Sequence, residues 1–211
     1  MGLMAKVPTG NGNYEPVPEG LHHAVCYRVT DLGTHATPWD TMVRKVLVSW
    51  ELPQERIDFE RDGVSENLPR VISKKYTLSL HDKANLRRDL ENWRGKKFTA
   101  QELTGWDLKK IIGANCFLQV LHKETKEGRT FADVSSIVGL PKKTEKLNPE
   151  NETAFFSFDD GGNIPEDTPE WITTLIKESV EWQQRQGRDT DPPPPEDEAV
   201  QTTEEGDEIP F

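Results

Sequence analysis

The sequence predicts a mainly β domain with one internal helix, followed by a second helix and an acidic tail. Five stretches between residues 20 and 138 alternate apolar and polar side chains with the period of two that half-buried strands show. Residues 83–94 instead repeat their apolar side chains with the period of a helix. The last sixty residues are mainly acidic and polar, so most of the core is expected to come from the region before them.

The first two predicted strands are residues 20–30 and 42–52, joined by a loop that contains Trp39. In the first strand, one face holds Leu21, Val25, Tyr27 and Val29, and the other holds Ala24, Cys26 and Arg28. In the second strand, the apolar face holds Val46, Val48, Trp50 and Leu52.

A polar insertion, residues 53–69, leads to the third predicted strand, residues 70–80, and the helix at residues 83–94 follows. The apolar residues of this strand are Ile72, Tyr76, Leu78 and Leu80. The helix is expected to begin at Asp82 as N-cap, to end at Gly95, and to bury Leu86, Leu90 and Trp93.

The last two predicted strands are residues 115–123 and 129–138, and Gly128 between them indicates a hairpin. In the second of these strands the pattern places Ala132, Val134 and Val138 on the core face, opposite Phe131 and Ile137.

A C-terminal helix is predicted from Thr168, as N-cap before Pro169, to about Gly187. Its apolar stripe contains Trp171, Ile172, Leu175, Ile176, Val180 and Trp182. Such a stripe needs a partner. The alternatives are packing on the strands, self-association into a homo-oligomer, and docking of another protein.

The order of three strands, a helix and two strands resembles the OB-fold, whose front face and loops bind oligonucleotides or oligosaccharides. An SH3-like barrel or an open antiparallel sheet with one helix would have a similar order. We expect a five-stranded OB-fold barrel with a helix between strands three and four. A C-terminal helix and a disordered acidic tail are expected to follow it.

Charge is divided unevenly along the 211 residues, whose formal net charge is −11. Residues 1–148 contain 23 basic and 19 acidic groups, whereas residues 149–211 contain 3 and 18. Residues 70–110 contain 11 basic and 5 acidic groups. A local basic excess of this kind is typical of a surface that binds a polyanion.

Several function classes find no support in the sequence. No segment has the roughly 18 apolar residues of a membrane helix. Cys26 and Cys116 lie ninety residues apart without a C-x-x-C motif, so we expect two reduced, buried thiols in a cytoplasmic protein. His22 and His23 would point to opposite faces of one strand, so they cannot share a metal ion. No catalytic or phosphate-loop motif is present, and we expect no enzymatic activity, metal or cofactor.

The sequence ends in Asp207-Glu208-Ile209-Pro210-Phe211, which resembles the acidic tip of bacterial and phage single-stranded DNA-binding proteins. Residues 76–98 and 128–137 resemble segments of phage-encoded proteins with functions near replication and recombination. The resemblance implies recruitment of replication, recombination or repair proteins by residues 207–211, in the cytoplasm of a bacterial host if a phage encodes the chain. The resemblance also implies that the chain is divided into four parts. These are a flexible lead-in (1–18), an OB-fold nucleic-acid-binding domain (19–145), an acidic linker with the C-terminal helix (146–187), and a disordered Pro-rich tail (188–211).

Single-stranded DNA calls for aromatic side chains on which bases stack and for cations along the phosphates. The first expected contact is Phe131 with Arg129, and the second is Trp39. The cations expected to contact phosphates are Arg44, Lys45, Lys74, Lys75, Lys123 and Lys126. Alternatively, Phe131 covers the sheet against the C-terminal helix and the lysines are ordinary solvated residues. Trp50, Trp93 and Trp106 are expected in the core or in helix packing.

These features favour sequence-independent binding and protection of single-stranded DNA. The alternative is a protein-interaction adaptor, or an inhibitor of a host protein, whose acidic tail imitates DNA. Binding of RNA by the same face is not distinguished from DNA binding, because stacking accepts any base.

Overall fold

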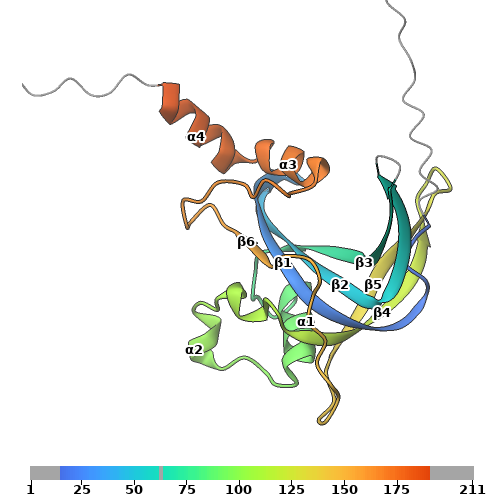
Figure 1. Ribbon diagram of the computed structural model, residues 1–211. Coiled ribbons are helices and arrows are strands. Elements are labelled where there is room, and N and C mark those ends of the chain that lie inside the picture. Colours follow the sequence, from blue (N-terminus) through green and yellow to red (C-terminus); the bar gives the residue numbers. More distant parts are fainter. Residues whose placement is uncertain (1–14, 62–63, 191–211) are drawn as a thin grey trace, which may run out of the picture.

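Five strands form a curved sheet in the order β3-β2-β1-β4-β5, and every neighbouring pair is antiparallel. The computed structural model (Figure 1) describes residues 15–61 and 64–190. The strands are β1 (Gly20–Ala36), β2 (Met42–Arg61), β3 (Val64–Thr77), β4 (Asn115–Glu124) and β5 (Thr130–Gly139). A short strand, β6 (Ala154–Phe156), pairs in parallel with β1. No ladder between β3 and β5 is found in the described part of the chain, so the sheet is open there.

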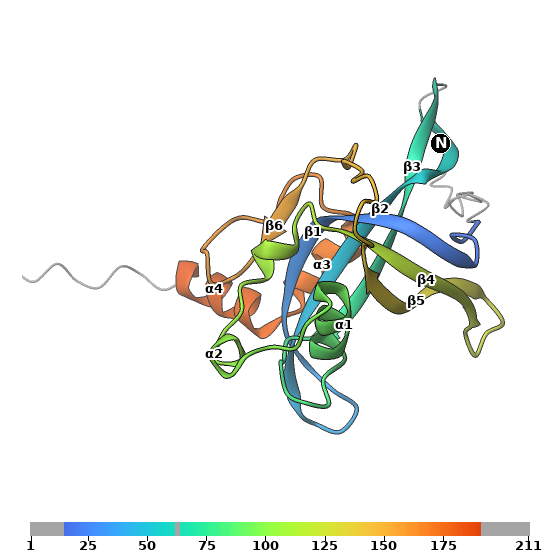
Figure 2. The ribbon, with the colours of Figure 1, turned by 90° about the horizontal axis from the view of Figure 1, so that it is seen from below.

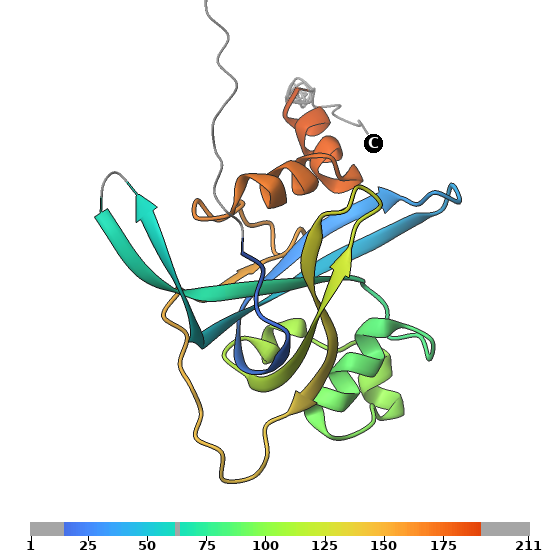
Figure 3. The same cartoon turned by 90° about the vertical axis from the view of Figure 1, so that its right-hand side faces the viewer.

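The helices lie on both sides of this sheet. They are α1 (Asn85–Arg94), α2 (Ala100–Leu103), α3 (Glu170–Lys177) and α4 (Val180–Thr190), with a 3₁₀ turn, η1, at Leu108–Ile111. Figure 3 shows α3 and α4 on one side of the sheet and α1 with α2 on the other. The prediction of a mainly β fold is confirmed. Among the described residues, no helix combines the length and apolar character needed to cross a membrane.

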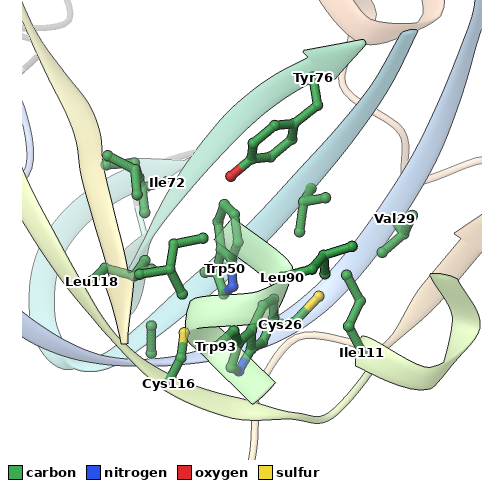
Figure 4. Packing of buried hydrophobic residues seen from close by; sticks show 14 of the residues in the cluster. Cys26, Val29, Trp50, Ile72, Tyr76, Leu90, Trp93, Ile111, Cys116 and Leu118 are labelled. Carbon is green, nitrogen blue, oxygen red and sulfur yellow. The ribbon is translucent and has the colours of Figure 1, made fainter. Parts of the chain in front are cut away.

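The main core forms where β2 faces α1 (Figure 4). The predicted apolar face of β2 is buried as expected, and Trp50 at its centre has no exposed surface. Its ring centroid lies 5.8 Å from that of Trp93 on α1, whose indole N–H donates to the backbone oxygen of Asn115 at 2.9 Å. Because each indole buries a large apolar area and the N–H group of Trp93 has its partner in Asn115, this pair fixes α1 on the sheet.

Helix α1 follows the predicted pattern except at its start. Leu86, Leu90 and Trp93 are buried, and Gly95 ends the helix in the left-handed conformation, which glycine adopts without a steric cost. The N-cap is Ala84 rather than the predicted Asp82, and no side chain caps the helix.

Residues 53–69 are predicted as a polar insertion between two strands. In the structure β2 and β3 instead continue through this segment as a long hairpin. After a register shift between Leu52 and Arg56, the pairs run from Arg56 with Pro69 to Arg61 with Val64. Leu68 in this extension is 40 % exposed. Backbone hydrogen bonds rather than a buried face hold it together, so the apolar alternation gave no signal.

Two irregularities move side chains to the opposite face from the predicted one. A register shift at Tyr27 in β1 lets Ala24, Cys26 and Val29 all join the core, whereas Leu21 is 60 % exposed. In β5, the shift opposite Gln119 and Val120 buries Ile137 and leaves Val138 51 % exposed. Each extra residue reverses the alternation after it.

Both cysteines are free and buried in this core. Cys116 pairs with Ala24, two residues before Cys26. Burial raises the pKa of each thiol, so both remain protonated and act as small apolar side chains. The prediction of reduced, buried thiols agrees with this placement.

The predicted single C-terminal helix is two helices, α3 and α4, that turn at Ser179. Ile172 and Ile176 of α3 enter a second core with Leu32 of β1 and Leu47 of β2. Packing on the sheet is therefore the alternative that the structure shows. Ser179 is fully buried where it faces Gly33, whose φ is +74°.

Gly33 provides a test of this docking. Gly33→Ala would place a Cβ atom 2.4 Å from the Cβ of Ser179. It would also introduce backbone strain, because alanine would have to adopt the positive φ of Gly33. We expect the free energy of unfolding to fall by about 2–5 kcal/mol, the sum of backbone strain and overpacking. Urea denaturation measures this loss.

The matched control is Gly128→Ala, since Gly128 has a φ of +77° and nothing within 4 Å of its Cβ position. It should lose only the backbone cost of about 1–2 kcal/mol. Equal losses in the two variants would contradict the close contact between Gly33 of β1 and Ser179 in the turn between α3 and α4.

Candidate nucleic-acid interface

The residues predicted to contact DNA lie in two groups at opposite ends of β1. The first lies around the start of β2 and the end of β3, where Lys45 pairs opposite Gly33. The second lies in the β4–β5 hairpin, which extends beyond the pair of Val120 with Gly20. Figure 2 shows the β1–β2 and β4–β5 turns pointing in different directions. The structure does not bring these residues into one cluster.

In the hairpin group, Phe131 is 38 % exposed on the face opposite the buried Val134. Lys123 lies directly across from Phe131, but its ammonium group is 2.5 Å from the carboxylate of Asp133. Lys126 and Arg129 are exposed in the turn and form no ion pair with the described residues. One aromatic ring and two unpaired cations therefore remain available here.

Trp39 is 82 % exposed in the β1–β2 turn. Arg44, five residues later, is not free to bind a phosphate, because its guanidinium already contacts two carboxylates. Its guanidinium contacts the carboxylates of Asp31 at 2.5 Å and Asp159 at 3.0 Å. The hydrogen bond to Asp31, followed by that to Asp159, raises the pKa of Arg44. Arg44 thus ties β2 to the segment that follows β6.

Lys74 also has a structural partner. Its ammonium group lies 2.8 Å from Oδ2 of Asp89, which is 2 % exposed, and the hydroxyl of Tyr76 donates to the same oxygen at 3.0 Å. Burial, reinforced by the charge of Asp89, raises the pKa of Tyr76. Arg88 contacts the other carboxylate oxygen of Asp89 at 3.2 Å, so Lys74 is one of two cations that balance this buried carboxylate, and it stabilises α1 against β3.

Four lysines nevertheless surround one hollow at the open edge of β3, which we call the lysine pocket. It has a volume of about 450 Å³, and its lysines are Lys45, Lys74, Lys75 and Lys83. None of the described residues that line it is acidic. Lys45, Lys75 and Lys83 form no ion pair with described residues.

Sequence reasoning missed Lys83, which lies in the connection between β3 and α1. The basic excess of residues 70–110 was the signal that could have found it. Its position in the same pocket as Lys75 depends on the turn directly before α1, where the backbone N–H of Ala84 donates to the backbone oxygen of His81.

The C-terminal segment covers the outer face of β1 and β2, where Leu47 is the cross-strand neighbour of Lys75. Leu47 is 3 % exposed beneath α3, and the fully buried Glu51 accepts the backbone N–H groups of Glu150 and Asn151 at 2.7 and 2.8 Å. Lys75 and Thr77 on β3 remain exposed. A nucleic acid therefore has access to β3 rather than to the middle of the sheet.

No group of three metal-binding side chains is found among residues 15–61 and 64–190. His22 contacts Glu55 at 3.0 Å, whereas His23 contacts Asn115 at 2.8 Å. The two histidines thus have separate partners. Residues 207–211, the predicted partner-binding tip, lie outside the described residues.

No family model matches this chain, and the search of curated proteins finds no similar sequence.

Glu91 anchors the cations around α1 and provides a pH test. It accepts hydrogen bonds from Lys97 at 2.8 Å, the backbone N–H of Phe98 at 3.2 Å and Arg87 at 3.1 Å. The bond to Lys97 is the largest cause that lowers its pKa from 4.5 to about 2. A carboxylate with a lowered pKa stabilises the fold above its ordinary pKa and loses this effect as pH falls.

We therefore expect the urea midpoint to fall between pH 4.5 and about 2, and Glu91→Gln to flatten that fall while lowering the midpoint at pH 7. Glu145→Gln, at an exposed carboxylate, should keep the wild-type curve. The same curve for Glu91→Gln and the wild type would show that Glu91 does not anchor these cations.

Proposed function

We propose that this protein binds single-stranded DNA without sequence preference, and that its sheet is an OB-fold of the kind found in single-stranded DNA-binding proteins. The strand order supports this architecture, because β1 pairs with both β2 and β4 and α1 lies between β3 and β4. Edge strands β3 and β5 also approach each other without pairing, which fits a partly open barrel.

The lysine pocket is the observation that carries the proposal. Like charges repel. A hollow with three lysines that form no described ion pair, Lys45, Lys75 and Lys83, and with no described acidic residue in its lining is therefore favourable when it holds an anion. Phosphate groups of a nucleic acid provide that anion, and release of their counterions favours binding. The half-exposed Phe131 and the exposed Trp39 are the rings on which bases would stack.

The biological role follows from the resemblance of residues 207–211 to the acidic tip of such proteins. We place the protein in DNA replication, recombination or repair, in a bacterial cytoplasm and encoded by a phage. The tip would recruit the partner proteins through Ile209 and Phe211, with Asp207 and Glu208 steering the encounter.

Titration of the protein with oligo-dT at several salt concentrations, followed by tryptophan fluorescence, tests the binding. Lys45→Gln with Lys75→Gln should flatten the dependence of log K on log salt by about 1.4, because each lost contact to a single strand removes about 0.7. Phe131→Ala should weaken binding by about 1–3 kcal/mol while the salt slope stays unchanged.

The charge-matched control is Lys142→Gln with Lys177→Gln, two exposed lysines outside the lysine pocket. It should retain the wild-type slope. A wild-type protein that binds no oligo-dT at 50 mM salt would overturn the proposal and favour the protein-interaction adaptor. Equal affinity for oligo-rU would extend the proposal to RNA.

The acidic tail gives a second test. Residues 149–211 carry 18 acidic and 3 basic groups, so we expect them to compete with DNA for the basic surface. Deleting residues 201–211 should leave the unfolding midpoint unchanged and leave affinity for oligo-dT equal or higher at low salt. It should also abolish binding of the partner proteins, and weaker DNA binding by the truncated chain would contradict this role.

A further inference from the structure

The lysine pocket continues into two more hollows along α1. The second hollow has a volume of about 270 Å³ and shares Lys83 and Ala84 with the lysine pocket. The third has a volume of about 460 Å³ and shares Glu91 and Lys97 with the second. The three hollows are thus neighbours from the edge of β3 to the end of α1, and we call them together the α1 groove.

Exposed charges in the α1 groove are mainly positive. Lys83, Arg88 and Lys96 are exposed, and Lys83 and Lys96 form no ion pair with the described residues. The acidic residues of α1 itself, Asp89 and Glu91, are 2 % and 7 % exposed. Burial hides their carboxylates behind the cations that they bind, so the groove presents a positive potential to solvent.

Asp82 is the exposed acidic residue of the groove, and its carboxylate lies 2.6 Å from Nδ1 of His81. It leaves the balance of charge positive, because Lys83, Arg87, Arg88 and Lys97 line the same hollow.

The third hollow adds an apolar surface to these cations. Val138 is 51 % exposed there, beside Ile137 of β5 and opposite Lys96 and Lys97. An apolar wall next to cations suits a nucleotide, whose base or sugar contacts the wall while its phosphate meets the lysines.

The coverage of the outer face of the sheet also favours the α1 groove as the path of the nucleic acid. Helix α3 and the segment near Glu150 occupy the outer face of β1 and β2. A single-stranded nucleic acid that enters at Lys75 therefore cannot continue across that face. The α1 groove leaves the lysine pocket in the other direction. Helix α1 has 10 residues, about 15 Å of length, which is enough to contact a few nucleotides.

We propose that the α1 groove is the path of the nucleic-acid backbone beyond the lysine pocket, with Lys83, Arg88 and Lys96 as phosphate contacts. This inference rests on the proposed function and assigns to α1 a binding role in addition to its packing against the core. The ligand is a single-stranded polyanion that lies along α1 with its phosphates toward the exposed cations.

The test is oligo-dT binding by the full chain with Arg88→Gln and Lys96→Gln, two residues of the groove outside the lysine pocket. Loss of two contacts should reduce the salt slope by about 1.4 and the affinity at 0.1 M salt on the order of 20-fold, with little change at 1 M salt. Lys142→Gln with Lys177→Gln makes the same change of charge outside the groove and should bind like the wild type.

A second variant separates binding from folding. Asn92→Asp adds a negative charge to the third hollow, beside Lys96 and outside the lysine pocket. We expect weaker binding of oligo-dT together with an unfolding midpoint only slightly below that of the wild type, because a negative charge near the C-terminal end of a helix opposes the helix dipole. Asn163→Asp, in an exposed loop outside the groove, should leave the affinity unchanged.

Wild-type binding with an unchanged salt slope in the Arg88/Lys96 variant would overturn the α1 path and leave the proposed function standing. Wild-type affinity in Asn92→Asp would overturn it as well. Absence of oligo-dT binding by the wild type would overturn both.

Discussion

Strand β1 is the element on which the other strands and the C-terminal helices depend, because both of its edges carry backbone hydrogen bonds along most of its length. One edge pairs with β2 from Val25 to Ala36. The other pairs first with β4, from Gly20 to Val25, and then with β6, from Arg28 to Thr30. Since an unpaired strand edge is costly when buried, β6 occupies the edge that β4 leaves. The C-terminal segment is thereby an integral layer of the fold.

Buried carboxylates organise the charges on this framework. Asp31, Glu51, Asp89 and Glu91 are each buried, and each accepts hydrogen bonds from a cation or from backbone N–H groups. A buried carboxylate is tolerated only with such partners. Because the acids of α1 are turned inward, the lysines around the helix determine the potential that solvent meets. The surface near α1 is therefore basic in a chain of net charge −11.

The same arrangement changes which side of the sheet can carry the proposed function. Trp39 and Phe131, the aromatic residues chosen from the sequence, lie at separate turns, whereas Lys45, Lys75 and Lys83 converge on one pocket. Helix α3 closes the outer face of β1 and β2. The edge of β3 and the exposed side of α1 are what remain for a polyanion to contact.

The sequence alone determined those elements whose apolar periodicity is unbroken or whose contacts are with residues close in sequence. The core face of β2 and the buried side of α1 are of this kind, since alternation or helical spacing decides which side chains share a face. Only tertiary structure decided the bulges in β1 and β5, the turn of α3 into α4 at Ser179, and the pairing of Arg44 and Lys74 with acids. Each of these depends on a partner from another element, such as Gly33 for Ser179 or Asp89 for Lys74, and a one-dimensional pattern contains no information about distances between elements.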